Sequence, residues 1–115
     1  MRIIGGKFKG KSLNHIKSIT TRPLKDMVKE NIFNILSHSK DISVNLENSK
    51  VLDLYSGTGS FGIECVSRGA KKVTFVEKDN NALKTLKKNL SEIRISDEAI
   101  LIKDSVENYL SRNKN

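Results

Sequence analysis

A glycine-rich segment at residues 57–62 has the spacing of a loop that holds a nucleotide. Its sequence is GTGSFG, the G-x-G-x-x-G pattern, and it lies between an apolar run and a helix-forming run. Glycine lets the backbone approach a ligand closely and adopt conformations that other residues avoid. The segment therefore predicts a nucleotide-binding loop, and the structural alternative is a tight turn that holds no ligand.

Three acidic residues have the positions that such a nucleotide site needs. Glu77 follows Gly57 by twenty residues, and a carboxylate there accepts hydrogen bonds from ribose hydroxyls of either NAD or S-adenosylmethionine. Asp53 precedes Gly57 by four residues; it would repel a pyrophosphate but attract the ammonium group of a methionine moiety. Asp104 offers an acceptor to an adenine amino group, or alternatively an N-cap to the last helix. The set favours S-adenosylmethionine.

Alternating strands and helices must position these carboxylates. Continuous apolar runs predict buried strands, and apolar residues at helical spacing predict helices. The expected elements are strand 51–55, helix 60–68, strand 73–76, helix 80–94, strand 99–102 and a helix over about 105–110. This order is the βαβαβ half of a doubly wound α/β fold, with strand order 3-2-1 and right-handed crossovers. The three acids should then converge on one crevice.

The first 25 residues carry seven basic side chains and no acidic one. Short β-prone pieces around glycines predict a β-hairpin over 2–13, with Lys7, Lys9 and Lys11 on one face. A helix should follow from Pro23 to about Ser37. Such a basic arm is typical of a polyanion-binding surface, and a solvated tail is the alternative. A polar linker then separates a basic part, residues 1–40, from a nucleotide-binding part, residues 41–115.

Composition limits the class of protein. The chain is 37% hydrophobic and 30% charged with a formal net charge of +8, which suits a globular domain. It has no apolar run of transmembrane length and no expected signal peptide. The lone Cys65 fits a reducing cytoplasm and a buried, unreactive thiol. His15 and His38 lack metal-ligand spacing, so no metal site is expected.

Several blocks of sequence resemble one methyltransferase family. The segment 51–62, the Glu77 step and the Asp104 step follow methyltransferase motifs in order and spacing. More specific are the opening RIIGGKFKG at residues 2–10 and the run TTRPLKDMVKE at residues 20–30. With these, the chain is similar to bacterial 16S rRNA guanine-N2 methyltransferases of the guanine 966 type. The resemblance covers nearly the whole chain and implies an incomplete Rossmann-like, class I methyltransferase fold.

The resemblance also implies roles for individual residues. The cofactor S-adenosyl-L-methionine would be held by Asp53, Tyr55, Gly57, Gly59, Glu77, Lys78, Asp104 and Ser105. The RNA would be held by Arg2, Lys7, Lys9, Lys11 and Arg22, largely through phosphates. The expected partner is 16S rRNA in the small ribosomal subunit or its assembly intermediate. The full-length protein is expected to be a cytoplasmic monomer that contacts no membrane. Tyr55 is as much a packing candidate as a cofactor contact.

One departure from the family pattern concerns catalysis. The family carries an Asp/Asn-Pro-Pro-Tyr motif after its fourth strand, whereas Pro23 is the single proline of this chain. We therefore expect a C-terminally truncated chain, with no catalytic residues of its own and little activity alone. Three alternatives remain at this point: another S-adenosylmethionine-dependent rRNA or DNA base methyltransferase, an NAD-binding oxidoreductase, and a non-enzymatic RNA-binding fragment.

Overall fold

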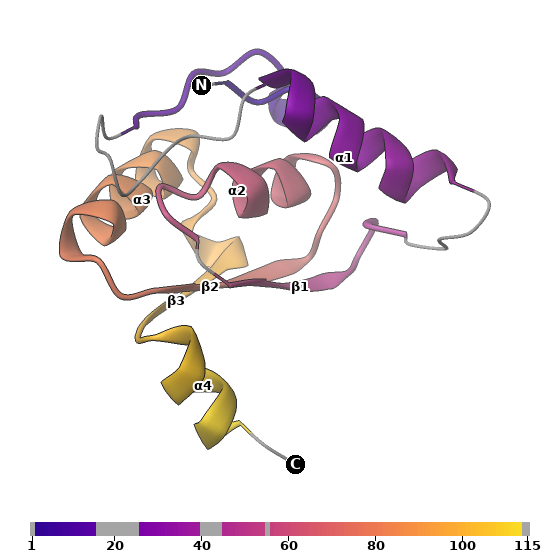
Figure 1. The fold of residues 1–115 in the computed structure, drawn as a ribbon. Coiled ribbons are helices and arrows are strands. Elements are labelled where there is room, and N and C mark those ends of the chain that lie inside the picture. Colours follow the sequence, from indigo (N-terminus) through magenta and orange to yellow (C-terminus); the bar gives the residue numbers. More distant parts are fainter. Residues whose placement is uncertain (1, 16–25, 40–44, 55, 114–115) are drawn as a thin grey trace.

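A three-stranded parallel sheet forms the centre of the computed structural model (Figure 1). The structure describes residues 2–15, 26–39, 45–54 and 56–113. In chain order the elements are the 3-10 turn η1 (Gly6–Phe8), α1 (Asp26–His38), β1 (Lys50–Leu54), α2 (Ser60–Ser67), β2 (Lys72–Glu77), α3 (Asn80–Ile93), the 3-10 turn η2 (Ser96–Glu98), β3 (Ala99–Lys103) and α4 (Val106–Arg112). The predicted strands and the helices after the glycine loop are confirmed, with bounds that shift by one or two residues.

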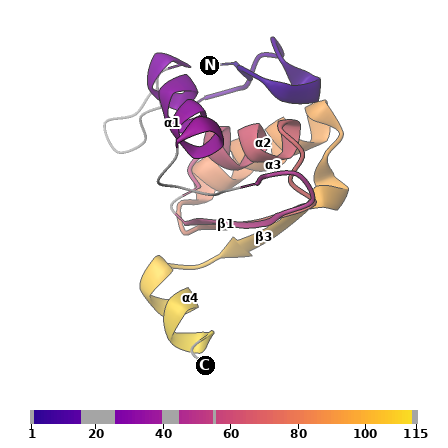
Figure 2. The ribbon, with the colours of Figure 1, turned by 90° about the vertical axis from the view of Figure 1, so that its right-hand side faces the viewer.

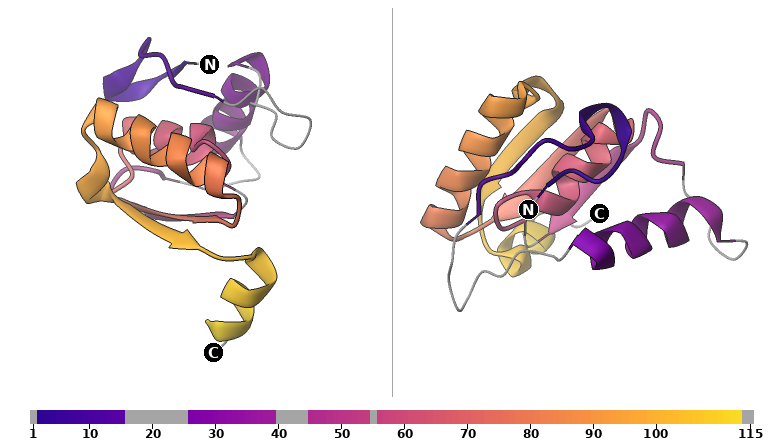
Figure 3. Two further views of the ribbon diagram at one scale, coloured as in Figure 1. Left: turned by 90° about the vertical axis from the view of Figure 1, so that its left-hand side faces the viewer. Right: turned by 90° about the horizontal axis from the view of Figure 1, so that it is seen from above.

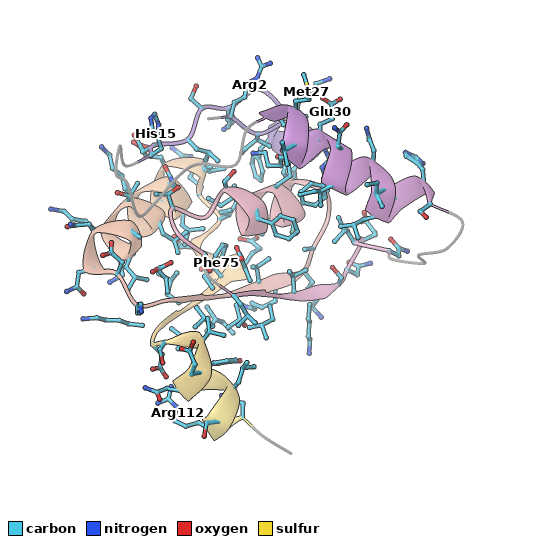
Figure 4. The ribbon with its side chains drawn as sticks, viewed as in Figure 1. Arg2, His15, Met27, Glu30, Phe75 and Arg112 are labelled. Atoms are coloured by element: carbon cyan, nitrogen blue, oxygen red, sulfur yellow. The ribbon has the colours of Figure 1, made fainter. Side chains whose placement is uncertain are left out.

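The strand order β1-β2-β3 confirms the predicted 3-2-1 arrangement, and both pairs are parallel. The register places Asp53 beside Phe75, and Phe75 beside Leu101. Phe75 is completely buried and lies between the sheet and the helices above it (Figure 4). The covering helix α3 presents a buried apolar stripe, Leu83, Leu86, Leu90 and Ile93, which is the pattern expected of a helix with one face in the core.

The two faces of the sheet differ in their cover. Helices α2 and α3 lie on one face, and α4 projects on the other side (Figure 2). On that second face Leu52, Thr74 and Ile100 are in register, and Leu52 and Ile100 are each 45% exposed. Within the described residues β1 is an edge strand.

The basic N-terminal segment, residues 2–14, packs against α2. The β-hairpin predicted for it is wrong in its central part. Arg2 and Ser12 form a single antiparallel bridge, but residues 6–8 form the turn η1 instead of a strand. The reason is that backbone N–H groups of this segment donate to side chains of α2: Ile4 and Gly5 to Glu64, and Phe8 to the Ser67 hydroxyl. Its lysines therefore do not line one face of a strand.

One hydrophobic core joins the N-terminal segment to the rest of the chain. Ile3, Leu13 and Phe33 belong to the same buried cluster as Ile63 and Leu86. The division between residues 40 and 41 stays a prediction, because residues 40–44 lie outside the described part, as does the helix start at Pro23. Among the helices that the structure describes, none has both the length and the apolar character that crossing a bilayer requires.

Cys65 has the buried environment that the sequence predicted. It is 1% exposed within the core. Burial, with the negative charges of Asp53 and Glu64, raises the pKa of its thiol to about 12. A thiol that stays protonated is a poor nucleophile, so Cys65 acts as a small apolar residue.

Candidate cofactor-binding site

The glycine loop connects the carboxyl end of β1 to the first turn of α2. Gly59 is the N-cap of α2 with φ 95°, and its N–H donates to the Ser56 carbonyl at 2.9 Å. The Ser56 hydroxyl in turn donates to the Asp53 carbonyl at 2.7 Å. A side chain on Gly59 would meet Leu86 of α3 at 2.3 Å. Small residues are therefore needed here both for the left-handed backbone and for the close approach of α3.

We expect Gly59→Ala to destabilise the chain more than Gly10→Ala. Both glycines have positive φ, but a Cβ on Gly10 would meet nothing within 4 Å. The alanine at position 10 should cost about 1–2 kcal/mol for its backbone conformation alone. The alanine at position 59 should cost about 1–3 kcal/mol more, because Leu86 must also move. Urea denaturation measures the difference, and equal costs would show that the contact with α3 is unimportant.

Asp53 lies buried on the inner face of β1, under the first turn of α2. One of its carboxylate oxygens, Oδ2, accepts a hydrogen bond from the Gly62 N–H at 3.1 Å. Burial raises the pKa of Asp53 to about 6; the Gly62 hydrogen bond opposes this rise and the charge of Glu77 adds to it. A carboxylate in this position gains most from a cationic group that a ligand brings to it.

Glu77 ties the end of β2 to the glycine loop. Its Oε1 accepts from the Gly57 N–H at 2.8 Å, and its Oε2 accepts from the N–H groups of Lys78 and Asp79 at 3.0 and 2.9 Å. An ionised carboxylate has about four acceptor sites, so three backbone donors leave capacity for a ligand hydroxyl. Lys78 takes part through its backbone, and its side chain is exposed.

Asp104 follows β3, at the same edge of the sheet as Asp53 and Glu77. These three acids form what we call the acidic edge, and the backbone of Asp104 bonds to that of Glu77. Its N–H donates to the Glu77 carbonyl at 3.1 Å, which places the ends of β2 and β3 together. Its side chain accepts from the Ser105 N–H at 2.8 Å and pairs with Arg112; Arg112 lies on α4 (Figure 4). The alternative role of Asp104 as a helix N-cap is wrong. Ser105 is the N-cap of α4, and its hydroxyl accepts from the Asn108 N–H at 3.1 Å.

The structure thus brings six of the eight predicted cofactor residues to one edge of the sheet. Lys78 is the seventh, and it contributes only its backbone. Tyr55 lies outside the described residues, as does Arg22 of the predicted RNA-contacting set. The remaining RNA candidates, Arg2, Lys7, Lys9 and Lys11, are all exposed on the N-terminal segment. The ammonium groups of Lys7 and Lys11 lie 5.2 and 5.4 Å from the centre of the Phe8 ring, so this surface combines positive charge with an aromatic ring.

A cavity of about 580 Å³ lies elsewhere, at the amino end of the strands. Its lining includes Lys7, Arg68 and Lys71, together with Glu47 and Glu98. The mixed charges select no particular ligand, and the lining contains none of the predicted cofactor residues. The chemistry of the acidic edge therefore locates the candidate site better than cavity size does.

Sequence reasoning missed three buried polar side chains beside the site. Lys29 of α1 and Glu64 of α2 are both fully buried and lie 3.3 Å apart. Asn89 of α3, 1% exposed, bonds to the Thr58 carbonyl within the glycine loop. Glu64 had one detectable signal, since it is the single charged residue within the apolar helix SFGIECVS. Lys29 and Asn89 lie among other polar residues and had none.

A glycine loop between β1 and α2, with acids at the ends of three parallel strands, defines the amino-terminal half of a Rossmann-like methyltransferase fold. A solved structure called "Putative methyltransferase yhhF from Escherichia coli" matches it with a TM-score of 0.80 at 29% identity, covering 96% of this chain and 56% of that one. The chain belongs to the family described as Conserved hypothetical protein 95, which it matches over residues 1–115.

Two curated relatives agree with this membership. "Ribosomal RNA small subunit methyltransferase D" of Haemophilus influenzae is 40% identical over 116 residues, covering 100% of this chain and 57% of the relative. "Putative rRNA methyltransferase YlbH" of Bacillus subtilis is 37% identical over 110 residues, covering 96% and 56%. The resemblance drawn from the sequence is therefore confirmed at the level of the family. The chain spans somewhat over half the length of these relatives.

Proposed function

We propose that this chain forms the S-adenosylmethionine-binding half of an enzyme that methylates the exocyclic N2 amine of a guanine in small-subunit rRNA. The observation that carries the proposal is the pair of hydrogen bonds from Gly57 to Glu77 and from Gly62 to Asp53. These bonds gather two carboxylates around the glycine loop. Relatives named as small-subunit rRNA methyltransferases support the substrate class.

The residues of this edge fit the chemistry of the cofactor. The buried carboxylate of Asp53 suits the ammonium group of the methionine moiety, because a cation would relieve the cost of its burial. The remaining acceptor capacity of Glu77 suits two ribose hydroxyls. Asp104 and Ser105 would lie at the adenine end. When bound, the cofactor supplies an electrophilic methyl group on a sulfonium.

The contribution of this half would be binding and orientation. The guanine N2 amine is a weak nucleophile because its lone pair is delocalised into the ring. Transfer therefore needs acceptors on the amine and a stacked, extruded base, and residues 1–115 carry no Asp/Asn-Pro-Pro-Tyr motif to supply them. The chain would fix the methyl donor and grip the RNA through its basic segment.

Calorimetry tests the cofactor assignment directly. S-adenosylhomocysteine, titrated into the 115-residue chain, should release measurable heat and raise the melting temperature. NAD at equal concentration should do neither, because its pyrophosphate would meet Asp53. A folded chain that ignores S-adenosylhomocysteine, or one that prefers NAD, would contradict the proposal.

The basic segment should bind RNA mainly through phosphates. Lys9 is exposed on this segment, whereas Lys84 is exposed on α3. We expect Lys9→Ala to weaken binding of a 16S rRNA fragment and to reduce the slope of log K against log salt by about 0.7–0.9. Lys84→Ala is the matched control and should change neither quantity. Equal effects of the two substitutions, measured by fluorescence anisotropy, would remove the segment from the RNA surface.

A further inference from the structure

The Asn89 side chain connects the glycine loop to the basic N-terminal segment. Its Nδ2 donates to the Thr58 carbonyl at 2.9 Å and to the Asn14 carbonyl at 3.0 Å. Its Oδ1 accepts from the backbone N–H and from the side-chain amide of Asn14, both at 2.8 Å. Two donors and two acceptor sites exhaust the capacity of the amide. A side chain that is 1% exposed and fully bonded has one favourable orientation.

This orientation acts on the backbone of the glycine loop, through the Thr58 carbonyl. The Thr58 carbonyl and the Gly59 N–H belong to one planar peptide group, so holding the carbonyl also orients the N–H. That N–H donates to the Ser56 carbonyl and closes the turn. Asn89 thereby helps to set the loop whose Gly57 N–H bonds to Glu77.

The other end of the same segment is fastened to the other side of Gly59. The buried Lys29 ammonium donates to the Arg2 carbonyl at 2.7 Å and to the Ser60 hydroxyl at 3.1 Å. Residues 2–14 are therefore held at both ends: Asn89 joins Asn14 to Thr58, and Lys29 joins Arg2 to Ser60, on the two sides of Gly59. Seen from above, this segment runs across α2 toward α3 (Figure 3).

We propose that Asn89 is a positioning residue that couples cofactor binding to the order of the basic N-terminal segment. The inference rests on the proposed function. A cofactor that narrows the range of loop conformations also favours the Thr58–Asn89–Asn14 bonds, and so orders the segment that carries Lys9 and Lys11. Linkage makes the effect reciprocal: RNA bound to the segment would tighten the cofactor by the same factor.

Hydrogen exchange of the 115-residue chain, with and without S-adenosylhomocysteine, measures this coupling. In the wild type the ligand should slow exchange both in residues 56–63 and in residues 10–15, by at least about fivefold in the latter. Asn89→Ala and Asn89→Asp should keep protection of 56–63 and lose protection of 10–15. Asn81→Ala, at an exposed position of the same helix, should behave as the wild type. A merely structural role would raise exchange without uncoupling the two regions.

The outcomes separate the two proposals. Calorimetric binding with protection confined to residues 56–63 in the wild type would overturn the coupling alone, as would protection of 10–15 that survives in Asn89→Ala. Absence of binding by the wild type would overturn the proposed function and this inference with it. If both Asn89 variants fail to fold, Asn14→Ala removes only part of the connection and should weaken the transmitted protection in the same direction.

Discussion

Replacing Glu64 by alanine should lower the free energy of unfolding by about 3–5 kcal/mol, which is the cost of leaving a buried charge without its partner. Glu64 is fully buried and accepts from the N–H groups of Ile4 and Gly5 and from Arg68 Nε, all between 2.8 and 2.9 Å. The Lys29 ammonium, also fully buried, lies 3.3 Å away. Removal of the carboxylate would thus strand a cation and two backbone donors. Urea denaturation measures the loss.

Two control variants show which interactions of Glu64 account for the loss of unfolding free energy. Lys29→Met should cost less than Glu64→Ala, because Glu64 would keep Arg68 and its two backbone donors. Glu107→Ala, at an exposed position of α4, should stay within about 0.5 kcal/mol of the wild type. A cost below about 1 kcal/mol for Glu64→Ala would mean that the N-terminal segment is not held through this side chain.

Replacing Asp53 by asparagine should have opposite effects on stability and on cofactor binding. Burial raises the pKa of Asp53 from 3.8 to about 6, so the folded state binds a proton more tightly than the unfolded state. The stability that the chain gains from this bound proton is fully present below about pH 4 and is lost as the pH rises through about 6. At neutral pH, Asp53→Asn should therefore stabilise the ligand-free chain, by about 1–3 kcal/mol.

The same substitution removes the charge proposed for the cofactor ammonium. Affinity for S-adenosylhomocysteine at neutral pH should fall about tenfold or more. Unfolding of the wild type and of Asp53→Asn between pH 4 and 7 isolates the contribution of Asp53. Asp97→Asn, at an exposed position in η2, is the control and should change neither quantity. A variant that is less stable at neutral pH, or one that binds the ligand as tightly as the wild type, would contradict this account of the site.

The two opposite effects of Asp53→Asn describe a compromise between stability and function. At neutral pH the wild-type chain keeps a buried carboxylate at a position where we expect an amide to be more stable. Residues whose local preference conflicts with the fold are expected at functional sites. The raised pKa of Asp53 therefore agrees with the proposed function. If Asp53 had only a structural role, Asp53→Asn would not lower the affinity for the cofactor.

The course of the backbone beyond the glycine loop could be predicted because its signals are local. Apolar runs of strand length, a stripe of leucines at helical spacing and a G-x-G-x-x-G segment each specify one element and its neighbours. Parallel topology then follows from the alternation of strands and helices. The carboxyl ends of such strands share one edge, so the position of Asp53, Glu77 and the Asp104 backbone could be inferred as well.

The N-terminal segment could not be predicted in the same way. Its β-prone residues and glycines favour a hairpin locally, yet Glu64 and Ser67, about sixty residues away, take its backbone N–H groups. A backbone donor pairs with whichever acceptor the fold brings near, and that acceptor has no signature next to the segment in the chain. The N-cap of α4 shows the same limit of sequence-based prediction on a smaller scale. Ser105, and not Asp104, accepts the hydrogen bond from the Asn108 N–H.

By itself, the amino-acid sequence determined the α/β half-fold, the glycine loop and the acidic edge. The elements and the loop depend on residues close together in the chain, and the acidic edge follows from the parallel order of the strands. Only the tertiary structure decided which polar groups are buried against that edge. Lys29 and Asn89 look like ordinary surface residues in the sequence, and Glu64 is marked only by the apolar helix around it. The three side chains become anchors because three helices and the N-terminal segment meet where water is excluded. Their pairing is a property of distances across the fold, and spacing along the chain carries no record of it.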